Sequence, residues 1–240
     1  MEAGPLSAKL SKSPPLGGVL IGSGTPALLV HQVAPRLTSV VGPGVRAVVW
    51  VQGCRIGCRG CLVPETWSRS GGRAVDAHEL ARKLLRDESL EGLTVSGGEP
   101  SDQPEAVAVL FEAFRADGRN GWLYSGHTLE ELVARNDPAI DRLLAATDVL
   151  VDGQYLEAKA CTAGFRGSRN QRLIPFNSRG EALIARARQT RLEIRLSNQG
   201  NLELMGIPPR GFLDAFERRL IQEGLAVRPA AGSQHIGEAS

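Results

Sequence analysis

The chain has 240 residues, 42% of them apolar, and a formal net charge of +2 from 28 basic and 26 acidic residues. These totals are typical of a globular protein, and without a basic block they give no basis for a nucleic-acid or membrane-surface role. No apolar run approaches the ~20 residues that span a bilayer, and the stretch at 16–30 is broken by Gly and Pro and lacks the basic leader of a signal peptide. We therefore expect a cytoplasmic protein, in which clustered cysteines are more often metal ligands than disulfides.

Strands and helices are expected to alternate along the chain after a flexible leader over residues 1–17. Strands are predicted within 46–54, 93–96, 121–126 and 148–153, and helices within 76–87, 102–117, 128–136 and 140–147. Asp76 is the expected N-cap of the first helix, and Thr128 with Glu131 forms a capping-box pattern. Residues 154–176 are expected to be loops. A helix at 180–189, strands within 192–197 and 201–207, an amphipathic helix at 211–224 and a disordered tail at 229–240 complete the prediction.

This alternation favours βα units and a mostly parallel sheet. In such sheets the chemistry lies at the carboxyl ends of the strands. Four polar or glycine-containing groups each follow a predicted strand: Cys54, the Gly97-Gly98-Glu99 turn, Ser125-Gly126 and Asp152-Gly153. If the strands are parallel, these groups meet at one rim.

Three of the four cysteines, Cys54, Cys58 and Cys61, lie within eight residues. A structural zinc site uses four protein ligands and a catalytic one can use three, whereas an iron–sulfur cube binds up to four cysteines, one per iron. Arg55 and Arg59 supply positive charge, and the glycines of the loop allow backbone N–H groups to turn toward sulfur. Buried, unreactive thiols are the alternative, which this clustering disfavours.

The spacing Cys-x3-Cys-x2-Cys resembles the signature of radical S-adenosylmethionine (SAM) enzymes. Further blocks, "LTVSGGEP", "LYSGHTLEEL", "DVLVDGQY" and "FRGSRNQRLI", follow in order over roughly residues 40–175. Together they resemble the activating proteins of anaerobic ribonucleotide reductases, within the glycyl-radical activating group. The resemblance implies a partial (β/α)6 TIM-like barrel, open on one side, with N- and C-terminal extensions. It implies a core domain at 18–180, an extension packing on it at 181–228, and the leader and tail outside both.

The resemblance also implies the site. Cys54, Cys58 and Cys61 would hold a [4Fe-4S] cluster with one open iron for SAM. The Ser96-Gly97-Gly98-Glu99 turn would hold the SAM amino group. Ser125, Gly126 and Asp152 would contact SAM from neighbouring strand ends, with Asp152 placed where relatives hold a cation or the SAM carboxylate. A later block of polar residues would lie near the active-site rim: Arg166, Ser168, Asn170 and Gln171.

Structural interpretations remain open beside these. The Gly-Gly-Glu-Pro segment is also a plausible plain turn, Asp152 a residue that ends a strand, and Arg166 with Asn170 loop-stabilising hydrogen-bonding residues. Several residues are not expected to be ligands: Cys161, His78 and His127, with Trp50 and Trp67 expected to pack.

The resemblance implies an enzyme that reductively cleaves SAM to a 5′-deoxyadenosyl radical and abstracts a hydrogen atom from a glycine of a partner protein. The resemblance also implies an electron donor such as flavodoxin or ferredoxin. We expect neither nucleic acid nor a membrane as a partner. Because both ends of the chain carry additional residues, a radical SAM enzyme acting on a small molecule or peptide is the alternative. A non-enzymatic iron–sulfur or zinc protein is the alternative from another class.

Overall fold

The computed structural model describes residues 7–9, 26–187, 191–196, 202–209, 211–224 and 226–228. The expected flexible leader, apart from residues 7–9, and the expected disordered tail lie outside these residues. The domain boundaries expected from the sequence stay predictions. No helix in the described ranges is both long and apolar enough to cross a bilayer.

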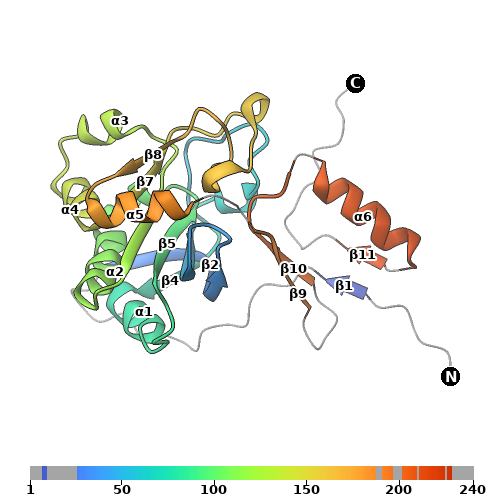
Figure 1. Ribbon diagram of the computed structural model, residues 1–240, viewed down its shortest axis with the longest axis horizontal. Helices are drawn as coiled ribbons and strands as arrows, with labels where there is room; N and C mark the ends of the chain where they lie inside the picture. The colour runs from blue at the N-terminus through green and yellow to red at the C-terminus, as the bar shows by residue number, and fades with distance from the viewer. Residues whose placement is uncertain are drawn as a thin grey trace.

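A seven-stranded sheet forms the centre of the fold, in the order β4-β2-β3-β5-β6-β7-β8 (Figure 1). Four adjacent strands run parallel, and β2, β4 and β8 each pair antiparallel with a neighbour. The strands are β2 (Ala27–Thr38), β3 (Val45–Val51), β4 (Arg73–Asp76), β5 (Gly92–Gly97), β6 (Asn120–Tyr124), β7 (Val149–Asp152) and β8 (Arg172–Pro175). The expected α/β class with a parallel-rich sheet is confirmed.

The flanking strands β2, β4 and β8 were not expected from the sequence. In β2 the pairing register with β3 shifts between Ala34 and Leu37, and Pro35 lies at this shift. Proline has no N–H to donate to a neighbouring strand, so within a sheet it is tolerated at such an irregularity. In β8 the strand is short and ends at Pro175 on the sheet edge. The described sheet has four adjacent parallel strands rather than six, so the partial (β/α)6 barrel is not confirmed.

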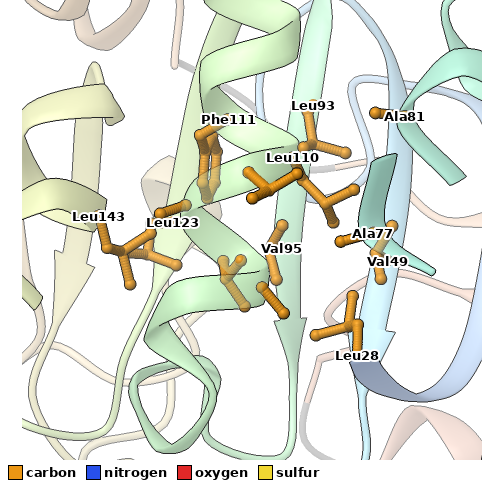
Figure 2. Packing of buried hydrophobic residues seen from close by; sticks show 14 of the residues in the cluster. Leu28, Val49, Ala77, Ala81, Leu93, Val95, Leu110, Phe111, Leu123 and Leu143 are labelled. Atoms are coloured by element: carbon orange, nitrogen blue, oxygen red, sulfur yellow. The ribbon is translucent and has the colours of Figure 1, made fainter. Parts of the chain in front are cut away.

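Four of the described helices, those between residues 77 and 146, cover one face of the sheet. The helices are α1 (Ala77–Leu84), α2 (Pro104–Ala116), α3 (Leu129–Val133), α4 (Pro138–Ala146), α5 (Ser178–Arg186) and α6 (Phe212–Gln222). Leu110 and Phe111 of α2 pack among Leu93, Val95 and Leu123 of the parallel strands (Figure 2). All five side chains are buried, so this layer anchors the strands whose carboxyl ends form the rim.

Side-chain caps explain where the helices begin. Asp76 accepts the N–H of Glu79, as expected for α1, and Asp137 accepts the N–H of Ala139 in α4. Thr128 and Glu131 form the full reciprocal capping box of α3, which confirms that expectation. These contacts are local in sequence, and each supplies a partner for an otherwise unpaired N–H at a helix start.

The opposite face of the sheet is covered by C-terminal segments. Leu183 of α5 belongs to a buried cluster with Trp122 and Phe165, and Met205 belongs to another with Leu37 and Val40. Met205 lies on a hairpin of β9 (Glu193–Leu196) and β10 (Leu202–Met205). In Figure 1 this hairpin lies between the large sheet and α6, β11 (Ala226–Arg228) and β1 (Ser7–Lys9), the last two of which pair parallel.

Candidate active site

The three clustered cysteines lie on a closed loop that leaves β3 at the rim. The N–H of Gly53 donates to Thr66 O at 2.7 Å, and the N–H of Cys54 donates to Trp67 O at 3.0 Å. Gly53, Gly57 and Gly60 all have positive φ, at 98°, 59° and 73°. Glycine adopts a positive φ without steric cost, which explains why glycines lie beside the cysteines in this loop.

The cysteine thiols are uncrosslinked and partly exposed. Partial burial raises the pKa of Cys54 and Cys61, and the charge of Cys58 nearby adds to this. The backbone N–H groups of Ile56 and Gly57 oppose that rise and lower the pKa of Cys54.

The donor set fits a four-iron cluster. In the described part of the chain, no three His, Cys, Asp or Glu side chains converge on one point to hold a single metal ion. A [4Fe-4S] cluster does not require such convergence, since each thiolate binds a different iron. Three free thiols on one loop are the donors that such a cluster takes.

Two glutamines hold this loop, Gln52 buried and Gln103 half-buried, and sequence reasoning did not identify either. Gln52 Nε2 donates to Glu65 O at 2.9 Å and to Ser68 O at 2.6 Å. Gln103 Nε2 donates to Gln52 O at 3.0 Å and to Leu29 O at 3.2 Å, and its Oε1 accepts the N–H of Leu29 at 2.7 Å. All these partners are distant in sequence, so no local pattern could have revealed them.

The Gly-Gly-Glu turn at the end of β5 is built against the start of the cysteine loop. The N–H of Glu99 donates to Gly53 O at 2.8 Å, and the N–H of Gly98 donates to Val51 O at 2.8 Å. A Cβ atom on Gly98 would lie 2.2 Å from Gly53 O, so any residue other than glycine would clash with that oxygen. The two motifs therefore form one backbone unit.

The carboxylate of Glu99 points into the protein. The side chain is 1% exposed, and Oε1 accepts from Ser101 N and Ser125 Oγ, both at 2.9 Å. Its Oε2 accepts from Gly126 N at 2.8 Å. Glu99 thus joins the end of β5 to the end of β6 and holds Ser125 and Gly126 in place.

A cavity of about 280 Å³ lies beside this junction. Its walls come from the cysteine loop and from the segment after β6, and the lining residues are Ile56, Gly126, His127, Thr128, Glu131 and Gln154. His127 Nδ1 lies 3.7 Å from Glu131 Oε2 on α3. Through Ile56, this cavity adjoins the cysteine loop.

Asp152 at the end of β7 is fully buried and fully paired. Arg172 donates to both of its carboxylate oxygens, and the N–H of Leu129 donates to Oδ2 at 2.8 Å. The contact of Asp152 with SAM stays a prediction. The rim does include Asp152, through Leu129 of the segment that lines the cavity.

The later polar block organises the loop at 153–171. Arg166 Nη1 donates to Gln171 O at 3.3 Å, and Asn170 Nδ2 donates to Gln154 O at 2.8 Å. Gln171 Nε2 donates to Gly153 O at 2.9 Å, and Ser168 Oγ accepts the N–H of Leu156 at 3.1 Å. These contacts match the loop-stabilising interpretation, and any cofactor role of Arg166 or Asn170 stays a prediction.

Ser96, Cys161 and His78 lie on three different segments of the fold. Ser96 is half-buried on β5, in register with Trp50 of β3. Cys161 is in the loop after β7, with Sγ 3.7 Å from Arg166 O. His78 is exposed on α1.

Comparison with known proteins gives a consistent set of relatives. The family model of the 4Fe-4S single cluster domain matches residues 40–174. The anaerobic ribonucleoside-triphosphate reductase-activating protein of Vibrio cholerae is 36% identical over 156 residues, which are 61% of this chain and 97% of that protein. The pyruvate formate-lyase-activating enzyme of Clostridium pasteurianum is 43% identical over 124 residues, 49% of each chain. The crystal structure of QueE from Escherichia coli matches 42% of this chain with a TM-score of 0.35 and 16% identity.

Proposed function

This chain belongs to the 4Fe-4S single cluster family of radical SAM activating enzymes, and on that basis we propose that it activates a partner protein by abstracting hydrogen from one of its glycines. Cys54, Cys58 and Cys61 would hold the cluster through one thiolate each. When bound, a [4Fe-4S] cluster with an open iron supplies the electron that splits SAM into methionine and a 5′-deoxyadenosyl radical.

The observation that carries the proposal is the hydrogen bond from the N–H of Glu99 to Gly53 O. It places the Gly-Gly-Glu turn directly beside the residue that precedes Cys54. A small molecule held by that turn therefore lies next to the cysteine loop without any further movement of the chain. The cavity between Ile56 and Gly126 offers room for the nucleoside part of SAM.

The chain's own residues would bind and orient SAM. Backbone groups of Gly97 and Gly98 can approach the methionine end closely, because neither residue carries a side chain. Glu99 acts by fixing Ser125 and Gly126, and Asp152 by fixing Leu129, through the contacts described above. Ser96, Arg166 and Asn170 remain proposed contacts at the same rim.

The partner class follows from the relatives. The V. cholerae protein is named as an activator of a reductase, and this chain aligns with 97% of its length. We extend that role to this chain, with a large glycyl-radical enzyme as the partner and flavodoxin or ferredoxin as the electron donor. Uncrosslinked thiols in the loop are compatible with the cytoplasm, which we propose as the compartment.

The decisive experiment is anaerobic reconstitution with iron and sulfide, reduction in the presence of SAM, and chromatography for 5′-deoxyadenosine. Wild-type protein should produce it, and Cys54→Ala, Cys58→Ala and Cys61→Ala should each abolish it because the cluster loses a ligand. Cys161→Ala is the matched control and should keep full activity. Full activity in Cys58→Ala would disprove the proposal. Addition of a candidate reductase should then give the EPR signal of a glycyl radical.

A further inference from the structure

A side-chain amide replaces a backbone pairing where β2 and β3 separate. The pairing register of these strands shifts between Val30 and Gln32, so His31 is an extra residue in β2. Next to this bulge, the N–H of Leu29 donates to Gln103 Oε1 at 2.7 Å, and Leu29 O accepts from Gln103 Nε2 at 3.2 Å. The Gln103 amide therefore exchanges two hydrogen bonds with Leu29, as a residue of a neighbouring antiparallel strand does.

The same amide holds the residue that leads into the cysteine loop. Gln103 Nε2 also donates to Gln52 O at 3.0 Å, and the N–H of Gln52 donates to Leu29 O at 2.9 Å. The buried side chain of Gln52 in turn donates to Glu65 O and Ser68 O on the returning half of the loop. The place where β3 ends and the loop begins is thus held by Gln103.

Gln103 also belongs to the segment that continues from the Gly-Gly-Glu turn. A single 3-10 turn, Pro100–Asp102, separates it from Glu99. The N–H of Glu99 donates to Gly53 O at 2.8 Å, while the Gln103 amide donates to Gln52 O. Residues 99–103 therefore bind the backbone oxygens of both residues that precede the first cysteine. Two adjacent carbonyl groups bound to one short segment fix the cysteine loop relative to the turn.

The helix that starts at this point makes no use of the Gln103 side chain. Gln103 occupies the N-cap position of α2, where Ser, Thr, Asp or Asn usually accept an N–H of the first helical turn. The Gln103 side chain makes no such cap bond. Its hydrogen bonds go to Leu29 and Gln52 instead, so the residue serves the sheet and the cysteine loop rather than its own helix.

We propose that Gln103 is a positioning residue of the active site, which sets the separation between the cysteine loop and the Gly-Gly-Glu turn through the backbone of Gln52. This inference rests on the proposed function, because SAM would be held between these two motifs. A displacement of about 1 Å between reacting groups can lower a rate by about 100-fold. The inference extends the proposed function by naming a residue outside both motifs on which their alignment depends.

The first test measures amide hydrogen exchange by NMR in the cluster-free protein. Gln103→Met keeps the side-chain length and removes the amide, so the N–H of Leu29 loses its acceptor. It should exchange about tenfold faster, and the N–H of Glu99 should do so too, because Gly53 O is no longer held in place. Gln222→Met makes the same change on an exposed residue of α6 and should leave both rates unchanged. A wild-type exchange rate of Glu99 N–H in Gln103→Met would overturn the inference.

A second measurement on the wild-type protein requires no stable variant. If Gln103 joins the two motifs, the N–H groups of Leu29 and Glu99 belong to one cooperative unit. Their exchange should then accelerate equally as urea is added. Different urea dependences of the two exchange rates would overturn the inference even if Gln103→Met does not fold.

The third test separates positioning from a general loss of stability in the reconstituted enzyme. At saturating SAM, Gln103→Met should form 5′-deoxyadenosine at least about tenfold more slowly, with wild-type iron content and a Kd for SAM within about threefold of wild type. Asp137→Ala removes the side-chain cap of α4 and should keep the wild-type rate. A wild-type rate in Gln103→Met would contradict the positioning role. Failure of the wild-type protein to form a cluster would instead disprove the proposed function, and the exchange experiments would still test the link through Gln103.

Discussion

Arg172 donates two hydrogen bonds to the buried carboxylate of Asp152, from Nε to Oδ1 at 2.9 Å and from Nη2 to Oδ2 at 2.5 Å. The same guanidinium donates to both oxygens of Glu130, at 3.0 and 2.6 Å. This arrangement ties the end of β7 and the start of β8 to the first turn of α3. The side chain at the end of β7 therefore shapes the rim through Arg172 and Leu129.

A double-mutant cycle should show strong coupling between these two residues. Without Arg172, Asp152 would keep a buried negative charge with no cation beside it, which is costly. We expect the coupling free energy from Asp152→Asn and Arg172→Gln, measured by urea unfolding of the cluster-free protein, to exceed that of the exposed pair Glu112 and Arg142. Equal coupling in the two pairs would contradict the structural role of Arg172.

The Glu130 carboxylate should make stability depend on acid pH. The hydrogen bond from Arg172 lowers the pKa of Glu130 to about 2, from an ordinary value of 4.5. Because the folded-state pKa is the lower one, this contribution is present above pH 4.5 and is lost as the pH falls toward 2. The gap in urea midpoint between wild type and Glu130→Gln should therefore shrink between about pH 6 and about pH 3.

That pH effect has two internal checks. Glu130 is exposed, so its pair with Arg172 should weaken at high salt, and the gap between wild type and Glu130→Gln should narrow there at neutral pH. In an Arg172→Gln background, Glu130→Gln should change stability little at any pH. A gap that persists unchanged at low pH would show that Glu130 stabilises the protein by other means.

Replacement of Glu99 should destabilise the cluster-free protein. Glu99→Ala leaves the N–H groups of Ser101 and Gly126 without their acceptor in a buried place, and we expect a loss of about 2–4 kcal/mol of unfolding free energy. Glu105→Ala, an exposed change on α2, is the control and should stay within about 0.5 kcal/mol of wild type. A urea unfolding midpoint of Glu99→Ala equal to that of wild type would rule out this role.

Reconstituted Glu99→Ala should also distinguish an effect on SAM binding from an effect on the iron–sulfur cluster. It should bind SAM more weakly, because Ser125 and Gly126 lose their anchor, while its iron content stays at the wild-type level. Isothermal titration with SAM and iron analysis measure the two effects independently. Loss of iron in this variant would place Glu99 in the support of the cluster itself.

Gly98→Ala should disrupt the junction between the two motifs. The added Cβ would lie 2.2 Å from Gly53 O, so the turn must move and the bond from Glu99 N–H to that oxygen must break. We expect at least tenfold weaker SAM binding, about 1.4 kcal/mol. Gly118→Ala, where no atom lies within 4 Å of an added Cβ, is the control for the general effect of the substitution. Wild-type SAM affinity in Gly98→Ala would contradict the proposed site.

Local patterns in the sequence were sufficient for much of the fold. The apolar run before Cys54 and the run around Leu93 to Ser96 became adjacent parallel strands, and Asp76 and Thr128 cap the helices as expected. These features depend on neighbours within a few residues, so their physics is contained in short segments. Convergence of Cys54, Glu99 and Ser125 at one rim followed from strand order alone.

Other features of the fold depend on contacts between residues that are distant in sequence, and only the tertiary structure revealed them. β2, interrupted by Pro35, became a strand because β3 and β4 pair with its two edges. β8 formed in an expected loop because β7 offered a free edge. The partner of Asp152 is Arg172, 20 residues away, and Glu99 holds Gly126 across 27.

The sequence by itself therefore supplied the candidate residues of the site, three cysteines and a Gly-Gly-Glu turn at strand ends, and the family resemblance that they carry. Only the tertiary structure decided how that site is held. Gln52 and Gln103 obtain their roles from backbone groups that reach them when the loop closes. A hydrogen bond depends on position and direction in space, and local sequence specifies neither across a closed loop.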